Sequence, residues 1–265
     1  MLSQFLPLLR NEIAKAVRRK LPYFGIFALG LLSTLIYFVG GHLTNTTGAN
    51  AWGYVAFSMQ CLFADIGPLF VIVFSGMLLS EETGAGTIRA TLAAPVHRWE
   101  LYAAKAVAGL GYTLVLSLAG LVFSVALAKI HYQFADIGDS FGVVYSRGTA
   151  VRQFLLGYAL SWIPLVALVM YGLFISTIIR SPGAAVAVGI SSVFLLDFTK
   201  HLVGLDPYIF TKYIGYSWTT LNQLAHGMEF QWQPDIWRML LVSGACAAVT
   251  FTLGLTIFVK EDLNR

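Results

Sequence analysis

Charged side chains are scarce in this sequence of 265 residues. Asp, Glu, Lys and Arg together make up 11% of it, whereas soluble domains contain about 25%. Hydrophobic residues make up 57% and gather in several long runs. Such runs reach the roughly 20 residues that a helix needs to cross a bilayer. The shortage of charge argues against a soluble protein, and the runs predict an all-α membrane protein with several spans.

Cysteine and the common catalytic patterns are also missing or rare. Cys61 and Cys246 both lie in apolar runs, so we interpret them as small core residues and predict no disulfide. No His or Cys spacing indicates a metal site, and no arrangement of Ser, His and Asp indicates a hydrolase. The net charge of +4 comes from residues at the ends of the apolar runs, so we expect no nucleic-acid partner.

A nucleotide-binding loop is absent as well. Gly84-Ala85-Gly86-Thr87 lacks the lysine and the preceding buried strand that a phosphate-binding loop requires. No long soluble segment is present that would form an ATPase domain. We therefore expect this chain to bind no cofactor, and any ATP and Mg to be bound by another polypeptide.

Hydropathy predicts six spans, which cover about 21–41, 55–80, 103–128, 151–179, 183–203 and 236–259. Basic residues are more frequent in the N-terminal segment, in the loop between the second and third spans and in the C-terminal tail. The positive-inside rule therefore places both termini in the cytosol, which agrees with an even number of spans. We treat residues 1–265 as a single transmembrane domain.

Residues 1–20 form the first predicted element. At 100° per residue the apolar side chains fall on one side of a helix, with Lys15, Arg18 and Arg19 on the other. This pattern predicts an amphipathic helix in the membrane interface, with its cations facing lipid headgroups. The alternative of a cleavable signal peptide is disfavoured, because the following apolar run is long and lacks an Ala-x-Ala site.

Two acidic residues lie inside predicted spans. An ionised Asp65 at bilayer depth costs about 2.5–3.5 kcal/mol, so its side chain should face protein or water, and Pro68 should kink the helix there. Asp65 either lines a substrate path or is a structural acid bonded to a neighbouring helix. Asp197 shares a helical face with Lys200 and His201, which favours a structural role over a place in the substrate path.

Three further segments have a recognisable pattern. The third span carries a stripe of small residues, which predicts close helix packing within the subunit or at a dimer seam. We expect residues 129–150 to form a solvated outer loop. The aromatic-rich segment 204–235 predicts one or two short helices that dip into the outer leaflet. The stripe consists of Ala106, Gly109, Thr113, Ser117, Gly120 and Ser124.

The longest polar interruption on the predicted cytosolic side is 81–105. Glu81 and Glu82 open it, and we expect Gly84 and Gly86 to supply a sharp turn. Residues 87–94 can then form two helical turns, which Pro95 ends. On this short helix Ile88, Thr91 and Leu92 share one face. A two-turn helix cannot bury that face in its own loop, so we predict that it docks on a partner.

These residues resemble the first cytosolic loop of ABC exporter permeases of the type-2 (ABC-2) class. That loop contains a Glu, then Gly-Thr, then a Pro and a basic residue. Here the corresponding residues are Glu81 or Glu82, Gly86-Thr87, Pro95 and Arg98, and the spacing leaves open which Glu takes the family's position. The resemblance implies that 81–105 is a coupling loop that docks on a separate ABC ATPase subunit. It also implies that 1–20 is a connecting helix and that 204–235 holds re-entrant helices, as in type V exporters.

The resemblance further implies the permease subunit of an ATP-driven exporter in a bacterial cytoplasmic membrane. We then expect a homodimer with two ATPase copies, in which Ile88 and Leu92 form an apolar contact and Arg89 reaches an acidic rim. Glu81 and Glu82 lie where the helix dipole disfavours anions, so they need a cationic partner: Arg89, Arg98 or the ATPase. The substrate is not specified by these motifs.

Two other functions compete with this interpretation. An ion- or proton-coupled secondary transporter would use Asp65 and Asp197, but such proteins usually contain internal repeats, and we find none. The other alternative is an intramembrane enzyme or an assembly scaffold that transports nothing.

Overall fold

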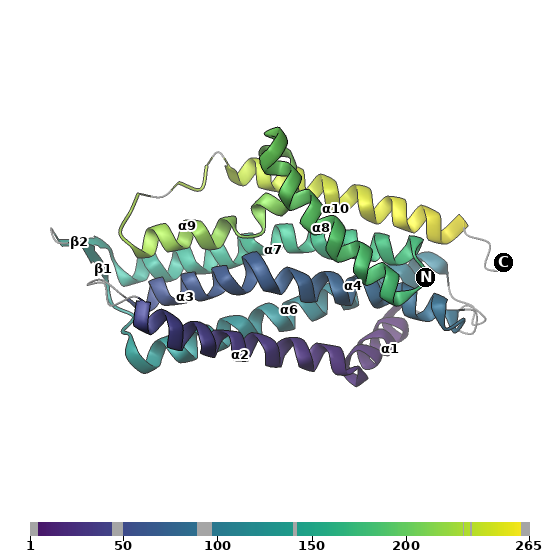
Figure 1. The fold of residues 1–265 in the computed structure, drawn as a ribbon, viewed down its shortest axis with the longest axis horizontal. Helices are drawn as coiled ribbons and strands as arrows, with labels where there is room; N and C mark the ends of the chain where they lie inside the picture. Colours follow the sequence, from purple (N-terminus) through teal and green to yellow (C-terminus); the bar gives the residue numbers. More distant parts are fainter. Residues whose placement is uncertain are drawn as a thin grey trace.

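The computed structural model describes residues 5–43, 50–88, 97–139, 142–229, 231–233 and 235–260. Long helices run side by side along the long axis of the molecule, and both termini lie at the same end (Figure 1). The predicted loop residues Arg89, Leu92 and Pro95 lie outside the described residues, as does most of the predicted helix 87–94.

Within the described residues, six helices are long and apolar enough to cross a membrane, which confirms the predicted number. All six begin one to five residues before the predicted limits, because helical geometry continues into the polar flanks of the apolar runs, and three of them end before the predicted limit. The spanning segments are Lys20–Val39, Ala51–Gly84, Arg98–His131, Arg147–Ile178, Pro182–Thr199 and Asp235–Lys260. They belong to α2 (Lys20–Leu43), α3 (Ala51–Gln60) with α4 (Gly67–Gly84), α6 (Arg98–His131), α7 (Arg147–Ile178), α8 (Pro182–Val203) and α10 (Asp235–Lys260).

The second span is interrupted by a π-helical segment, η1 (Cys61–Ile66), between α3 and α4. Here the backbone N–H of Gly67 bonds to the carbonyl of Leu62, five residues back. Pro68 follows in the first turn of α4. Proline has no N–H and its ring clashes with the preceding turn of an α-helix, and a wider turn accommodates both effects. The predicted disturbance at Pro68 is therefore present as a π turn.

The core of the bundle lies where α7 packs against both α4 and α10. The Ser176 hydroxyl accepts hydrogen bonds from the backbone N–H groups of Leu79 and Ser80, at 2.8 and 2.9 Å. Gly172 faces Ser75 so closely that there is no space for a side chain between α7 and α4. The small residues predicted as a packing stripe on α6 are buried within the chain, so at least part of that stripe is used for packing inside the subunit.

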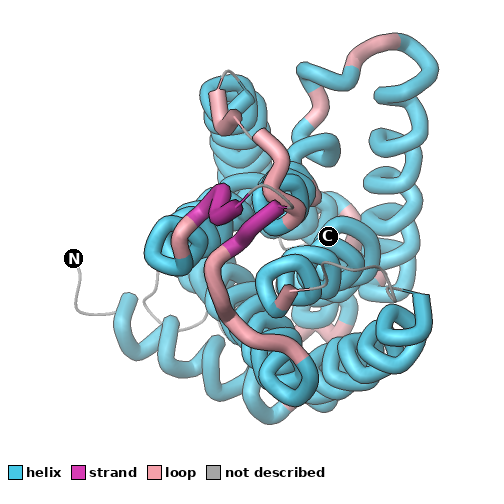
Figure 2. The backbone as a smooth tube through the Cα atoms, turned by 90° about the vertical axis from the view of Figure 1, so that its left-hand side faces the viewer, coloured by secondary structure: helices cyan, strands magenta, loops and turns pink. Residues whose placement is uncertain are grey.

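The end of the bundle opposite the termini contains short elements. Strands β1 (Ile137–Asp139) and β2 (Gly142–Tyr145) form an antiparallel hairpin, which Figure 2 shows facing the viewer. The predicted outer loop 129–150 thus contains a short hairpin between α6 and α7, whereas the rest of the fold is helical as predicted. Buried Ile137 anchors the hairpin to the bundle. The carboxylate of Asp136 accepts the Arg147 N–H at 2.6 Å, at the start of α7.

The aromatic-rich segment contains two 3-10 helices, η2 (Asp206–Tyr208) and η3 (Phe210–Tyr213), followed by α9 (Tyr216–Ala225). Helix α9 packs against α3 and α7 and buries Trp218, Leu221 and Leu224. The first helix, α1 (Phe5–Arg18), lies at the end that holds the termini (Figure 1).

Candidate functional site

Four charged side chains meet at the end of the bundle that holds α1, and we call them the charge cluster. They are Glu12 on α1, Lys15 on the same helix, Glu82 in the last turn of α4 and Lys105 near the start of α6. The two carboxylates and two ammonium groups balance in charge. Residues far apart in the sequence therefore form one neutral ionic group that joins three helices.

Lys105 is the central residue of the charge cluster, and its side chain has no exposed surface. Its ammonium group lies 2.9 Å from Glu12 Oε2, 2.9 Å from Glu82 Oε1 and 2.9 Å from the Leu78 carbonyl oxygen. A lysine has three N–H donors, so all three are paired here. This complete pairing offsets the cost of removing the charge from water.

Lys15 bridges the same two carboxylates from the solvent side. Its ammonium group lies 2.7 Å from Glu12 Oε1 and 2.8 Å from Glu82 Oε1, and 33% of its side chain is exposed. Burial lowers the pKa of Lys15, but hydrogen bonds and charge interactions with the two carboxylates outweigh that effect and leave the pKa above its usual value. Lys15 is therefore cationic at any physiological pH.

A second ion pair lies beside the charge cluster. Arg19, which follows α1, pairs with Glu81. The prediction that Lys15 and Arg19 face lipid headgroups is thus wrong, because both pair with carboxylates at the end of α4. Helix α1 instead turns Leu8 and Glu12 inward and leaves apolar side chains exposed. The exposed apolar residues are Leu6, Ile13 and Val17.

The connection between α4 and α6 is shorter than the predicted 81–105, because α4 continues to Gly84 and α6 begins at Arg98. Gly86 has a φ of 69° and forms the turn, as only glycine adopts this conformation without strain. The Thr87 hydroxyl donates a hydrogen bond to the Glu82 carbonyl at 3.4 Å. Gly84 packs closely against the Arg180 carbonyl, which places the start of the connection next to the turn between α7 and α8.

Two residues of the predicted docking surface contact their own chain instead. Ile88 is only 3% exposed and belongs to the hydrophobic core, so it anchors the connection to the bundle and does not project from it. The Arg98 guanidinium donates to the Val259 carbonyl at the end of α10, at 3.0 Å. Within the described residues, the cations next to Glu81 and Glu82 are therefore Arg19, Lys15 and Lys105, not Arg98.

The two acids proposed for a substrate path lie outside the charge cluster. Asp65 lies in the π-helical segment η1, and its side chain is exposed in the single chain. Within the described part of the chain, no hydrogen bond or ion pair of Asp65 is found. Asp197 lies on α8 and is half-buried. Because exposure of a carboxylate to lipid is costly, a protein or water environment for Asp65 stays a prediction.

Sequence reasoning missed Glu12 and Lys105. A signal was present, since a lysine inside the third apolar run and an acid in a basic helix are each costly to bury alone. Two such opposite charges predict a buried pair. The pattern does not say which residues pair, because Glu12 and Lys105 are separated by 93 positions.

Comparisons with known proteins bear on the family of this chain. A family model described as ABC-2 family transporter protein matches residues 8–196, which include the charge cluster and the connection between α4 and α6. The chain is also 21% identical to the uncharacterised protein YhcI of Bacillus subtilis (strain 168) over 234 residues, covering 86% of this chain and 74% of that protein. The match of the family model to most of the chain shows that it belongs to the ABC-2 family of transporter membrane proteins.

Proposed function

We propose that this chain is the permease subunit of an ATP-driven exporter and that a separate ABC ATPase docks on the connection between α4 and α6. Family membership supports a permease role, and the nucleotide-binding loop missing from the sequence supports an ATPase on another polypeptide. The ATPase binds ATP and Mg, and this chain forms the path across the membrane.

The observation that carries the coupling proposal is the charge cluster. It joins α1, α4 and α6 directly beside the connection, since Glu82 lies two residues before Gly84, where α4 ends. To move the end of α4 alone, the buried carboxylate of Glu82 would have to leave Lys105. Separating a buried ion pair costs about 3–5 kcal/mol. A displacement of the connection is therefore transmitted to all three helices together.

The further parts of the proposal follow from the family. We infer a homodimer with two ATPase copies in a bacterial cytoplasmic membrane, with the termini and the connection on the cytosolic side. The distribution of basic residues supports this orientation. Asp65 is kept as a candidate residue of the substrate path, because its exposed carboxylate requires an environment other than lipid.

The experiment tests docking at the connection. The full chain is expressed together with a candidate ABC ATPase, and recovery of the complex and its ATP hydrolysis are measured. We expect Leu92→Asp to insert normally but to weaken ATPase binding more than about tenfold, because an apolar contact of about 1.5–3 kcal/mol is lost.

The matched control is Val143→Asp, which places the same charge on the exposed strand β2, at the opposite end of the molecule. This variant should bind the ATPase as the wild type does. Equal ATPase binding and equal hydrolysis in Leu92→Asp and the wild type would contradict docking at this connection.

A further inference from the structure

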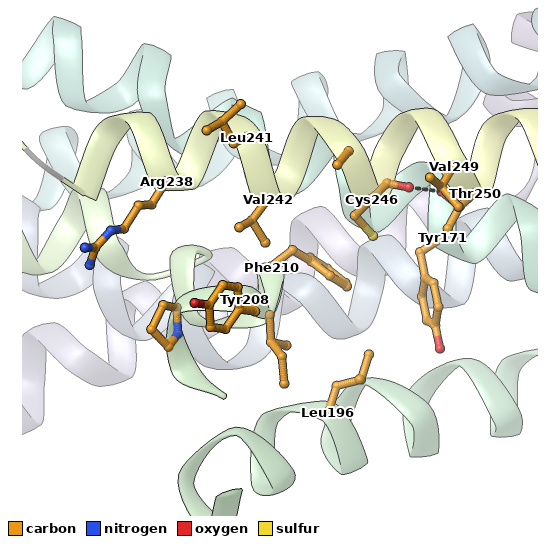
Figure 3. Close-up of a pocket in the computed structure, with 13 residues that line it drawn as sticks. Tyr171, Leu196, Tyr208, Phe210, Arg238, Leu241, Val242, Cys246, Val249 and Thr250 are labelled. Atoms are coloured by element: carbon orange, nitrogen blue, oxygen red, sulfur yellow. Dashed lines mark hydrogen bonds between the residues drawn. The ribbon is translucent and has the colours of Figure 1, made fainter. Parts of the chain in front are cut away.

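A cleft of about 760 Å³ lies between α8 and α10 (Figure 3). One wall is a strip of α10, and Leu196 of α8 lies across from it. Tyr171 of α7 and Phe210 of η3 also line the cleft. The α10 side chains are Arg238, Leu241, Val242, Ala245, Cys246, Val249 and Thr250.

The cleft is about as long as one leaflet of a bilayer is thick. Its lining on α10 extends from Arg238 to Thr250, which is about 18 Å at 1.5 Å per residue. Arg238 lies in the first turn of α10, where the span begins. Half of a hydrocarbon core of roughly 30 Å is about 15 Å. The cleft therefore extends from headgroup level to about the middle of the membrane.

The two ends of the cleft differ in chemistry. Arg238 and Tyr208 lie at one end, whereas Tyr171 and Thr250 lie at the other (Figure 3). The Arg238 side chain is 57% exposed and forms a long ion pair of 3.9 Å with Asp235, one turn earlier on α10. Between the ends, Leu241, Val242 and Val249 provide an apolar wall. A ligand that fits this arrangement has an anionic group at one end and an apolar chain behind it.

We propose that this cleft binds one anionic phospholipid, with its phosphate facing Arg238 and one acyl chain lying along α10. In the predicted orientation the lipid comes from the outer leaflet. Both walls are open to the membrane, since only 17% of the membrane-spanning part of α8, and the same share of α10, is buried inside the chain. Lipid therefore has direct access from the side.

A second copy of the chain fits the cleft less well. A helix of a second copy would have to bring an acid to Arg238, whereas every anionic phospholipid has a phosphate at the required depth. The proposal does not depend on the ATPase, because lipid binding is measured on this chain alone.

The test uses the purified full chain in bilayers of equal parts phosphatidylglycerol and phosphatidylcholine with identical acyl chains. Native mass spectrometry then measures which lipids stay bound. We expect the wild type to retain phosphatidylglycerol preferentially. Arg238→Gln should lower that preference about fivefold, the effect of one basic residue at an anionic membrane surface. The control Arg152→Gln, at an exposed arginine near the start of α7, should leave the preference unchanged.

A second variant tests the apolar part of the cleft. Ala245→Trp fills the space between the walls, so it should reduce retention of both lipids, whereas Leu253→Trp, outside the cleft on the same helix, should not. Three results would overturn the proposal: no lipid preference in the wild type, an unchanged preference in Arg238→Gln, or conversion of a dimer to a monomer by Ala245→Trp. Arg238 is exposed, so its variant tests the proposal even if Ala245→Trp fails to fold.

Discussion

The charge cluster and the cleft between α8 and α10 show two opposite ways in which helices of this chain are arranged. At the charge cluster, α1, α4 and α6 meet through ions of which Lys105 is completely buried. At the cleft, α8 and α10 face each other across an open space lined mainly by apolar side chains. The first region holds its helices at fixed separations, whereas the second leaves space for a ligand.

This difference corresponds to the burial of the helices themselves. The membrane-spanning segments that include α4 and α6 are 61% and 33% buried, whereas those of α8 and α10 are each 17% buried. A tightly packed, ionically joined group of helices transmits displacement, because its members cannot move independently at low cost. Lipid can enter the cleft between α8 and α10 without separating α10 from α7, against which it packs. We therefore expect changes at the two regions to have different consequences.

The largest expected effect comes from breaking the charge cluster at its centre. Lys105→Met leaves the carboxylates of Glu12 and Glu82 facing each other with only Lys15 to balance them. We expect a loss of about 3–5 kcal/mol in the free energy of unfolding, the usual cost of removing one partner from a buried ion pair. Reversible unfolding of the purified chain in detergent with increasing denaturant measures this loss.

Two comparisons make the Lys105 result specific. Lys129→Met changes an exposed lysine at the other end of α6 and should alter stability by no more than about 0.5 kcal/mol. The triple variant Lys105→Met, Glu12→Gln and Glu82→Gln removes the charge imbalance and should regain part of the lost stability. Equal stability of Lys105→Met and Lys129→Met would show that the buried ions do not hold these helices together.

The next prediction compares apolar packing on α4 with apolar packing in the wall of the cleft. Leu79 on α4 is completely buried, whereas Val249 in the wall of the cleft is 53% exposed. Leu79→Ala should cost about 2–5 kcal/mol, because the void left behind removes contacts from all the surrounding atoms. Val249→Ala should cost less than about 0.5 kcal/mol. Thermal unfolding of both variants gives the comparison, and a similar cost for the two would mean that the cleft is closed and packed.

The sequence predicted the spans well but not these two regions. Hydropathy locates a span because one apolar run is enough to define it, as for α8 and α10. The charge cluster depends on which side of α1 faces the bundle, and periodicity identifies the two sides of a helix without saying which is buried. Glu12 belongs to the buried side together with Lys15, so the apolar side is exposed instead.

Other features were missed because the strands are short and because the cleft depends on how far apart two helices lie. Strands β1 and β2 contain three and four residues, too few for an alternating pattern to be recognised. The cleft depends on the separation of α8 from α10, which no local pattern specifies. The turn at Gly86 was predicted, because a polar interruption with two close glycines is a local signal that needs no information from the rest of the chain.

The smallest expected effect concerns the Arg19–Glu81 ion pair. Its coupling energy shows whether burial or a short distance determines how much an ion pair stabilises this chain. The two side chains are 2.5 Å apart, closer than the 2.9 Å of the Lys105 contacts, but they are 24% and 28% exposed. If proximity determined the contribution, this pair would be the stronger one. Because water competes for both exposed groups, we expect a coupling energy of at most about 1 kcal/mol. A double-mutant cycle with Arg19→Gln, Glu81→Gln and both together measures it, and added salt should weaken it. A coupling energy of about 3 kcal/mol that salt leaves unchanged would show that this pair joins α1 to α4 as firmly as the buried cluster does.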